Sequence, residues 1–164
     1  MKIKGLISED FVNYKKPAMT IMFPYCTFKC GTEYCQNSPL SKAEDIEIDI
    51  TNIVIRYLNN PITESVVMQG LEPFDSWDDL IEFVKQLRES TDDDIVIYTG
   101  YNKEEIADKI TLLSKYKNIV ISTSKSKNTE VKVYGFSNSK RIEGFINSSG
   151  VVKNKDSLNK YKVF

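Results

Sequence analysis

The stretch that decides the fold is Ser65-Val66-Val67-Met68-Gln69-Gly70-Leu71-Glu72-Pro73, a short apolar run that ends in a polar turn. Its apolar part, Ser65 to Met68, is continuous and does not alternate with polar residues. That pattern is typical of a strand buried on both faces of a parallel sheet. Three more runs of this kind occur along the chain, at Met19–Phe23, Ile95–Tyr98 and Ile119–Ile121. The sequence therefore predicts four buried strands.

Amphipathic helices are predicted between these strands. Apolar residues repeat at helical spacing in three stretches, Ile50–Leu58, Leu80–Leu87 and Ile106–Leu113. Ser76 has the position of an N-cap for the second helix, and Asn102 and Glu105 are spaced like a capping pair before the third.

Alternating strands and helices imply right-handed crossovers and a parallel sheet. Weaker strand patterns follow at Glu130–Tyr134 and Arg141–Asn147. The predicted fold class is α/β, with a mostly parallel sheet of about five to six strands. Four or five βα units make only a partial (βα) barrel, so we expect a barrel that stays open on one side.

Length and composition limit the class of protein. The 164 residues suit a single domain spanning 1–164, with a core of about 15–147 and a basic tail of about 148–164. The formal net charge is −1 with both signs mixed, which disfavours nucleic acid as a partner. No apolar run has the length of a membrane span, and Met1–Gly5 lacks an apolar signal core. We expect a cytoplasmic protein, and we interpret Asp92–Asp94 as a solvated loop.

The three cysteines, Cys26, Cys30 and Cys35, all fall within ten residues. In a cytosolic protein, clustered cysteines more often bind metal or perform redox chemistry than form disulfides. Histidine is absent, so a closed zinc site of four cysteines, or of three cysteines and a histidine, cannot form within one chain. A four-iron cluster held by three thiolates keeps one iron open to an outside ligand. The cysteines alone leave three alternatives: an iron–sulfur cluster, a zinc site completed by a carboxylate or a second chain, and redox thiols.

Four polar segments follow the four predicted strands. They are the cysteine segment 26–35, Gln69–Pro73, Thr99–Tyr101 and Ser122–Ser124. Because parallel α/β sheets place their sites at the carboxyl ends of the strands, we expect these segments to line one rim.

The segment Cys26-Thr27-Phe28-Lys29-Cys30-Gly31-Thr32-Glu33-Tyr34-Cys35-Gln36-Asn37 resembles the cluster loop of the radical S-adenosylmethionine superfamily, C-x3-C-x2-C. Cys26 and Cys30 keep the first spacing, and Tyr34 matches an aromatic residue that often precedes the third cysteine. Four residues separate Cys30 from Cys35, where the family has two. The resemblance implies that the three cysteines are the catalytic ligands of a [4Fe–4S] cluster and that the fold is like the radical S-adenosylmethionine core.

Gln69–Pro73 looks like the G-G-E-P motif of the same superfamily, with one glycine replaced. In the family this turn engages the amino group of S-adenosylmethionine, and a carboxylate with outward carbonyls suits an ammonium group. The resemblance thus implies S-adenosylmethionine as the second cofactor. The contacts that we expect for it come from Phe28, Tyr34, Gln69, Gly70, Glu72, Thr99 and Ser122.

Within the superfamily, the chain is most similar to the short activating enzymes of anaerobic ribonucleotide reductase. Asn37, Thr99–Tyr101 and the segment Gly135–Arg141 carry this likeness, whereas Ser122–Ser124 replaces an expected acidic residue. The resemblance implies a flavodoxin- or ferredoxin-type electron donor and a glycyl-radical enzyme as the partner. Two alternatives stay open: a radical enzyme acting on a small molecule or peptide, and a non-catalytic zinc or redox module, which the wider Cys30–Cys35 gap keeps in view.

Overall fold

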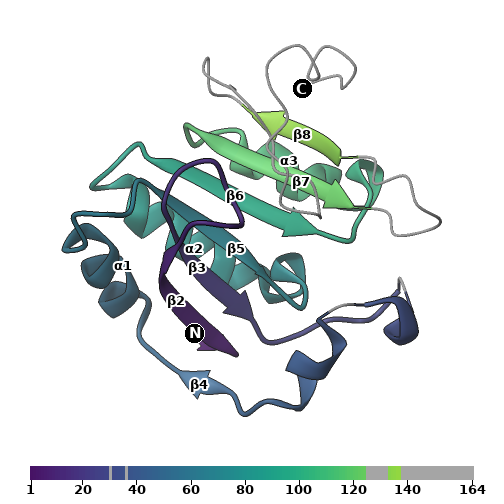
Figure 1. Ribbon diagram of the computed structural model, residues 1–164. Helices are drawn as coiled ribbons and strands as arrows, with labels where there is room; N and C mark the ends of the chain where they lie inside the picture. Colours follow the sequence, from purple (N-terminus) through teal and green to yellow (C-terminus); the bar gives the residue numbers. More distant parts are fainter. Residues whose placement is uncertain (30, 36, 125–132, 138–164) are drawn as a thin grey trace.

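The computed structural model describes residues 1–29, 31–35, 37–124 and 133–137 (Figure 1). Within them, six strands form one sheet in the order β2-β3-β5-β6-β7-β8, and β1 pairs with β4 in a separate two-stranded ribbon. The strands are β1 (Lys2–Ile3), β2 (Gly5–Asp10), β3 (Ala18–Phe23), β4 (Ile46–Glu47), β5 (Ser65–Gly70), β6 (Asp94–Thr99), β7 (Ile119–Ser124) and β8 (Val133–Ser137).

The four strands in the middle of the sheet, β3, β5, β6 and β7, are parallel to one another, and the edge strands β2 and β8 run antiparallel to their neighbours. The predicted α/β class with a mostly parallel sheet is therefore confirmed. That the sheet curves into a partial barrel stays a prediction. The predicted strand Arg141–Asn147 and the tail 148–164 lie outside the described residues.

Three α-helices and four 3-10 turns connect the described strands. They are α1 (Ile50–Leu58), α2 (Trp77–Arg88), α3 (Ala107–Leu113), η1 (Thr32–Tyr34), η2 (Ser38–Lys42), η3 (Pro73–Ser76) and η4 (Lys103–Ile106). The predicted helix Ile50–Leu58 has these bounds, and the Asp49 carboxylate caps it by accepting from the Thr51 amide.

Two capping predictions have different outcomes. Asn102 and Glu105 form the expected capping box at the start of η4. Ser76 does precede α2, but its hydroxyl makes no capping bond and is buried without a hydrogen-bond partner. A 3-10 turn, η3, leads directly into α2 and replaces the open N-terminus that a capping serine serves. No helix in the described part of the chain is long and apolar enough to cross a membrane.

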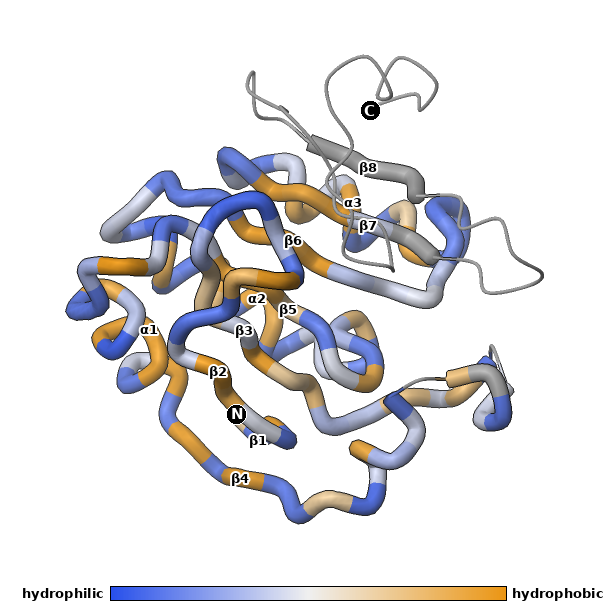
Figure 2. The backbone as a smooth tube through the Cα atoms, in the orientation of Figure 1, coloured by the Kyte–Doolittle hydropathy of each residue, from blue (hydrophilic) through white to orange (hydrophobic). Residues whose placement is uncertain are grey.

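Both faces of the parallel strands are buried, as their continuous apolar runs predict. The helices cover one face, where the larger core includes Val66, Met68 and the α2 residue Phe83. On the other face, Val67 and Val96 pack with Tyr14 from the segment 11–17. Figure 1 shows this segment crossing in front of the sheet, and Figure 2 shows apolar residues along the strands and polar ones in the outer turns.

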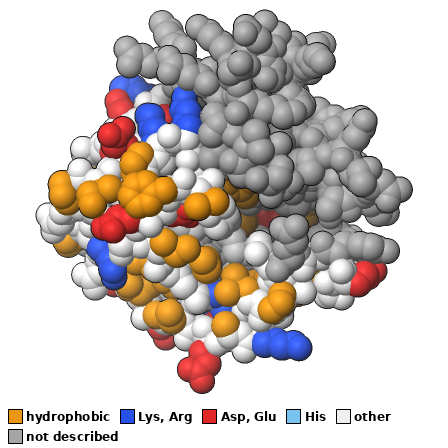
Figure 3. All heavy atoms as spheres, in the orientation of Figure 1, with side chains coloured by type: hydrophobic (Ala, Val, Ile, Leu, Met, Phe, Trp, Pro, Cys, Tyr) orange, Lys and Arg blue, Asp and Glu red, His pale blue; other side chains and the backbone are white. Residues whose placement is uncertain are grey.

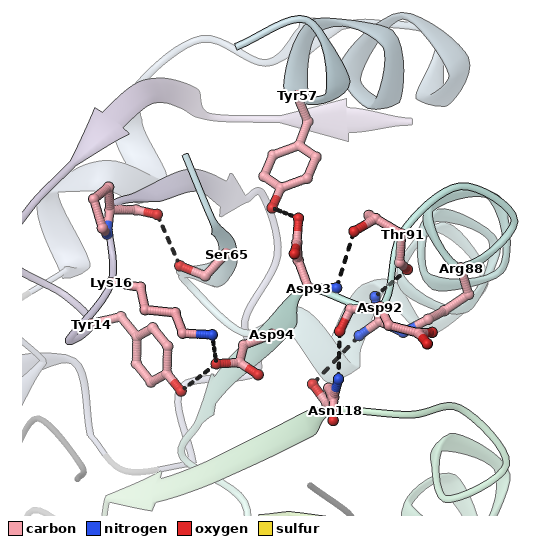
Figure 4. A network of polar contacts seen from close by, with 11 residues as sticks. Tyr14, Lys16, Tyr57, Ser65, Arg88, Thr91, Asp92, Asp93, Asp94 and Asn118 are labelled. Atoms are coloured by element: carbon pink, nitrogen blue, oxygen red, sulfur yellow. Dashed lines mark hydrogen bonds and ion pairs between the residues drawn. The ribbon is translucent and has the colours of Figure 1, made fainter. Parts of the chain in front are cut away.

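Polar contacts at the amino ends of the strands hold the segment 11–17 in place (Figure 4). Asp94, the first residue of β6, is buried and accepts a hydrogen bond from the Tyr14 hydroxyl at 3.0 Å. Its carboxylate lies 2.8 Å from the ammonium of Lys16. Asp93 accepts from the Tyr57 hydroxyl at 2.7 Å. The interpretation of Asp92–Asp94 as a solvated loop is thus wrong for Asp93 and Asp94, because tyrosines from distant elements bind both carboxylates.

Exposed apolar side chains gather on the side of the molecule where β2 forms the edge of the sheet, as the orange atoms of Figure 3 show. Those in β2, the segment 11–17 and α1 are Ile7, Phe11, Val12, Ile55 and Leu58. Phe11 and Val12 follow Asp10, which pairs with the first residue of β3. Phe11 and Val12 therefore lie toward the amino ends of the parallel strands, away from the edge where the cysteines are found.

Candidate functional site

The cysteine segment begins where β3 ends and runs beside the loops that follow β5 and β6. The Leu71 amide donates to the Phe23 carbonyl at 3.2 Å, and the Glu72 amide donates to the Tyr25 carbonyl at 2.8 Å. These bonds extend the pairing of β3 and β5 beyond the sheet. The predicted meeting at one edge is confirmed for the cysteine, Gln69–Pro73 and Thr99–Tyr101 segments. Of the fourth predicted segment, Ser122 and Thr123 pair with Tyr98 and Thr99 at the end of β6.

Four of the predicted contact residues lie inside strands and not beyond their ends. Gln69 and Gly70 close β5, and Thr99 closes β6. Ser122 is buried within β7 and lies opposite Tyr98 of β6. The apolar runs end earlier than the strands do, because backbone pairing continues through these polar residues.

Gly70 has a conformation that only glycine adopts readily. Its φ is +105°, and a Cβ at this position would lie 2.7 Å from the Phe23 nitrogen and 2.9 Å from the Met22 Cα. Its carbonyl accepts a hydrogen bond from the Asn37 side chain at 3.0 Å. The glycine of the motif thus allows β3 and β5 to approach closely, and its carbonyl binds Asn37, two residues after Cys35.

Glu72 is buried, with 4% of its surface exposed, and joins the loops after β5 and β6. Its Oε1 accepts from the Thr99 hydroxyl at 2.8 Å and from the Phe74 amide at 3.1 Å, while Oε2 accepts from the Gly100 amide at 2.9 Å. Burial raises the pKa of the Glu72 carboxyl to about 7, against the opposing effect of these hydrogen bonds. A buried carboxylate with a raised pKa, placed just after the carboxyl end of a parallel strand, is typical of a functional site.

Cys26 and Cys35 are half-buried, and neither forms a disulfide. The Cys26 sulfur accepts a hydrogen bond from the Phe28 amide at 3.2 Å. Cys35 lies between η1 and η2, where its amide donates to the Thr32 carbonyl. Cys30 and the Tyr34 side chain lie outside what the structure describes. Among the residues that it does describe, no three histidine, cysteine, aspartate or glutamate side chains gather as a metal site, so the three-cysteine ligand set stays a prediction.

Two hollows meet at Cys26. The larger has a volume of about 420 Å³ and the smaller about 40 Å³. Phe28 and Asp75 help to line the larger, and Glu72 and Tyr101 help to line the smaller. Cys26 and Thr27 border both. The first cysteine therefore has open space on the side of the aromatic residues and on the side of the buried carboxylate, as a ligand to an inserted group requires.

Sequence reasoning missed Asp75, which connects the cysteine segment to the loop after β6. Its Oδ2 accepts from the Thr27 amide at 2.9 Å, and its Oδ1 accepts from the Tyr101 hydroxyl at 2.5 Å. Burial and the bond to Asp75 raise the pKa of Tyr101 to about 12. In the sequence, Asp75 looks like an acidic residue at the start of a helix, so nothing there distinguishes its role.

Comparison with known proteins supports an iron–sulfur cofactor for this chain. A family model described as "4Fe-4S single cluster domain" matches residues 17–143, which include all three cysteines. No match was found among the curated proteins or among the solved structures. Of the alternatives that the cysteines left open, the family supports the iron–sulfur cluster. Because the matched region spans most of the chain, the protein belongs to the 4Fe–4S single cluster domain family and is an iron–sulfur protein.

Proposed function

We propose that the protein is a radical S-adenosylmethionine enzyme whose [4Fe–4S] cluster is held by Cys26, Cys30 and Cys35. The observation that carries the proposal is the backbone bond from Glu72 to Tyr25, which sets the first cysteine next to a buried carboxylate. Three thiolates leave one iron for an outside ligand. A carboxylate nearby suits the ammonium group of S-adenosylmethionine.

Glu72 has the properties that binding an ammonium group requires. It is held rigidly by three donors, and its pKa of about 7 leaves it close to half protonated at neutral pH. A cation beside it favours the ionised form, so binding of the ammonium and loss of the carboxyl proton support each other. The other contacts proposed for S-adenosylmethionine are Phe28, Tyr34, Gln69, Gly70, Thr99 and Ser122.

A cluster held by Cys26, Cys30 and Cys35 and reduced by a flavodoxin- or ferredoxin-type donor would supply one electron to the sulfonium of S-adenosylmethionine. The bond from sulfur to the 5′ carbon would then break, giving methionine and a 5′-deoxyadenosyl radical. The protein's own part is to orient the cofactors and keep water away from the radical. This chemistry needs no acid–base residue, which is compatible with a chain that has no histidine.

As the reaction partner we propose a glycyl-radical enzyme such as anaerobic ribonucleotide reductase, with the radical taking a hydrogen atom from a glycine of that partner. Two segments that resemble the activating enzymes support this proposal by lying at the site: Asn37 donates to Gly70, and Tyr101 to Asp75.

A small molecule or peptide as the substrate is the second candidate. The observation that favours it is the hollow of about 420 Å³ beside Cys26, a volume within the range of small-molecule sites.

Reconstitution with iron and sulfide under anaerobic conditions tests the proposal. We expect an EPR signal of a reduced [4Fe–4S] cluster that changes when S-adenosylmethionine is added, release of 5′-deoxyadenosine, and loss of all three in Cys26→Ala. Stoichiometric zinc in the purified protein, with no such signal after reconstitution, would contradict it. A stable glycyl radical after mixing with a candidate reductase would favour the activating role. A 5′-deoxyadenosine yield that depends on an added small molecule would favour the second candidate.

A further inference from the structure

The turn that carries Cys26 is fixed on both sides by the connection between β5 and α2. On one side, the Tyr25 carbonyl accepts from the Glu72 amide at 2.8 Å. On the other side, the Thr27 amide donates to the Asp75 carboxylate at 2.9 Å. The backbone before and after the first cysteine is therefore set by contacts that do not involve the cysteine itself.

The next residue along this turn, Phe28, has an unusual backbone conformation. Its φ is +52°, in the left-handed region that a phenylalanine rarely adopts. In this conformation its amide donates to the Cys26 sulfur at 3.2 Å, and its carbonyl accepts from the Gly31 amide at 2.9 Å. A strained backbone persists only where the surroundings hold it, so the contacts of the adjacent Thr27 take part in holding it.

Tyr101 completes this arrangement from the loop after β6. Its hydroxyl donates to Asp75 Oδ1 at 2.5 Å, while Asp75 Oδ2 accepts from Thr27. The Lys29 ammonium lies 4.9 Å from the centre of the Tyr101 ring and 3.5 Å from the Glu105 carboxylate. Both oxygens of Asp75 are thus engaged, and the tyrosine that orients the carboxylate also contacts the cysteine segment.

We propose that Asp75 and Tyr101 are positioning residues that fix the Cys26 turn so that the Phe28 amide donates to the Cys26 sulfur, and that this bond raises the reduction potential of the cluster. The inference rests on the proposed function in taking Cys26 as a ligand. Hydrogen bonds to cluster sulfurs stabilise the more negative, reduced state, and are one of the means by which proteins set such potentials.

Tyr101→Phe is the variant that tests the inference, because it removes one hydroxyl and leaves the charge near the cluster unchanged. We expect the midpoint potential, measured by EPR-monitored redox titration without S-adenosylmethionine, to shift to a more negative value. We also expect the cluster to be lost to a chelator about tenfold faster, as is usual when an outer partner of a metal ligand is removed.

Tyr57→Phe is the matched control. It also breaks a bond from a tyrosine hydroxyl to an aspartate, Asp93, but at the amino ends of the strands. We expect it to keep the wild-type potential and the wild-type rate of cluster loss even where it lowers the stability of the fold.

A second pair of variants separates the geometry of Asp75 from its charge. Asp75→Ala removes the acceptor of the Thr27 amide, and we expect rapid cluster loss. Asp75→Asn keeps an oxygen that can accept this bond, so we expect cluster loss close to the wild-type rate. Equal rates in the two variants would contradict the inference.

Failure of the positioning role can be distinguished from failure of the proposed function. If Tyr101→Phe keeps the wild-type potential while the wild-type cluster responds to S-adenosylmethionine, the positioning role is wrong and the proposed function stands. If Cys26→Ala assembles the same cluster as the wild type, Cys26 is not a ligand and both are wrong.

Discussion

Gly70, the last residue of β5, joins the sheet to the candidate site and has a positive φ that few other residues adopt. An alanine there must keep a φ of +105° and place its Cβ 2.7 Å from a backbone nitrogen, which cannot move aside as a flexible side chain could. The left-handed conformation and the overpacking together predict a loss of about 3 kcal/mol in the free energy of unfolding for Gly70→Ala. Chemical denaturation of the apoprotein measures this change.

Gly100→Ala is the control for this prediction. A Cβ on Gly100 would lie 3.7 Å from Glu72 Oε2, which is ordinary van der Waals contact. We expect this variant to stay within about 0.5 kcal/mol of the wild type. A similar loss in both variants would show that the close approach of β3 and β5 is not what requires glycine at position 70.

Glu72 makes the stability of the apoprotein depend on pH. Burial raises its pKa from the ordinary value of 4.5 to about 7 in the folded state. Between these two pH values the folded protein keeps a proton that the unfolded chain has lost. The free energy of unfolding should therefore fall as the pH rises from about 4.5 to about 7, by about 3 kcal/mol in total, and then level off.

Glu72→Gln removes this titration and mimics the protonated carboxyl. We expect the free energy of unfolding of the variant, measured by urea denaturation from pH 5 to pH 8, to lack the decline attributed to Glu72. The difference between wild type and variant isolates this residue from the other carboxyl groups. Parallel curves for the two proteins would mean that Glu72 is already ionised in the fold at pH 5.

At the scale of elements, the apolar runs were sufficient to predict the parallel strands. Val66 and Met68 face the helices while Val67 faces Tyr14, so a run without polar gaps is what two buried faces require. The ends of the strands were harder to predict. Gly70 and Thr99 continue the strands through backbone pairing, which the hydropathy of the side chains does not show.

The run of aspartates Asp92–Asp94 shows why some contacts cannot be predicted from a sequence. Asp94 is separated by 80 residues from Tyr14, its hydroxyl donor. Three aspartates in a row favour a solvated loop, and only the tertiary contacts change that, from the segment 11–17 to Asp94 and from α1 to Asp93. Asp75 is a similar case, since Thr27 and Tyr101 come from two other loops.

These aspartates allow a test of how the segment 11–17 is attached. Asp94→Ala leaves the buried Tyr14 hydroxyl without its acceptor and Lys16 without its ion pair, so we expect a loss of about 2 kcal/mol in the free energy of unfolding. Asp92→Ala removes only an exposed pair with Lys117 and should cost less than about 0.5 kcal/mol. Thermal denaturation of both variants measures the difference, and equal losses would contradict a special role for Asp94.

At the scale of the whole molecule, the sheet and the cysteine segment are held by different forces. Neither Cys26 nor Cys35 belongs to the described apolar cores, which the strands and helices build among themselves. The cysteine segment is held instead by a few hydrogen bonds at the carboxyl edge, such as those of Asp75 and Asn37. An iron–sulfur cluster could be predicted from the three closely spaced cysteines together with the resemblance to a known cluster loop. The attachment of the segment could not be predicted, since its partners are far apart in sequence.

Because the apolar cores and the cysteine segment are held by different interactions, removal of the metal should affect the two differently. Stripping iron from the reconstituted protein with a chelator should leave the far-ultraviolet circular dichroism and the cooperative unfolding transition in place, because neither Cys26 nor Cys35 belongs to the described cores. Under the proposed function, in which the three cysteines hold the cluster, the cysteine segment should loosen, since bonds to the metal would contribute to its order. We expect trypsin to cleave after Lys29, whose side chain is 62% exposed, several-fold faster in the apoprotein than in the reconstituted protein.

Cleavage after Lys117 provides the internal reference. Its side chain is 75% exposed, and it lies just before β7 at the amino ends of the parallel strands, far from the cysteines in the fold. Its rate should be the same with and without the cluster, because nothing in its surroundings depends on the metal. Equal acceleration at both lysines would mean that the cluster stabilises the whole domain, and loss of the cooperative transition would mean that the sheet does not fold without it. Acceleration confined to Lys29 requires a fold that forms first and a cysteine segment that the cluster then orders.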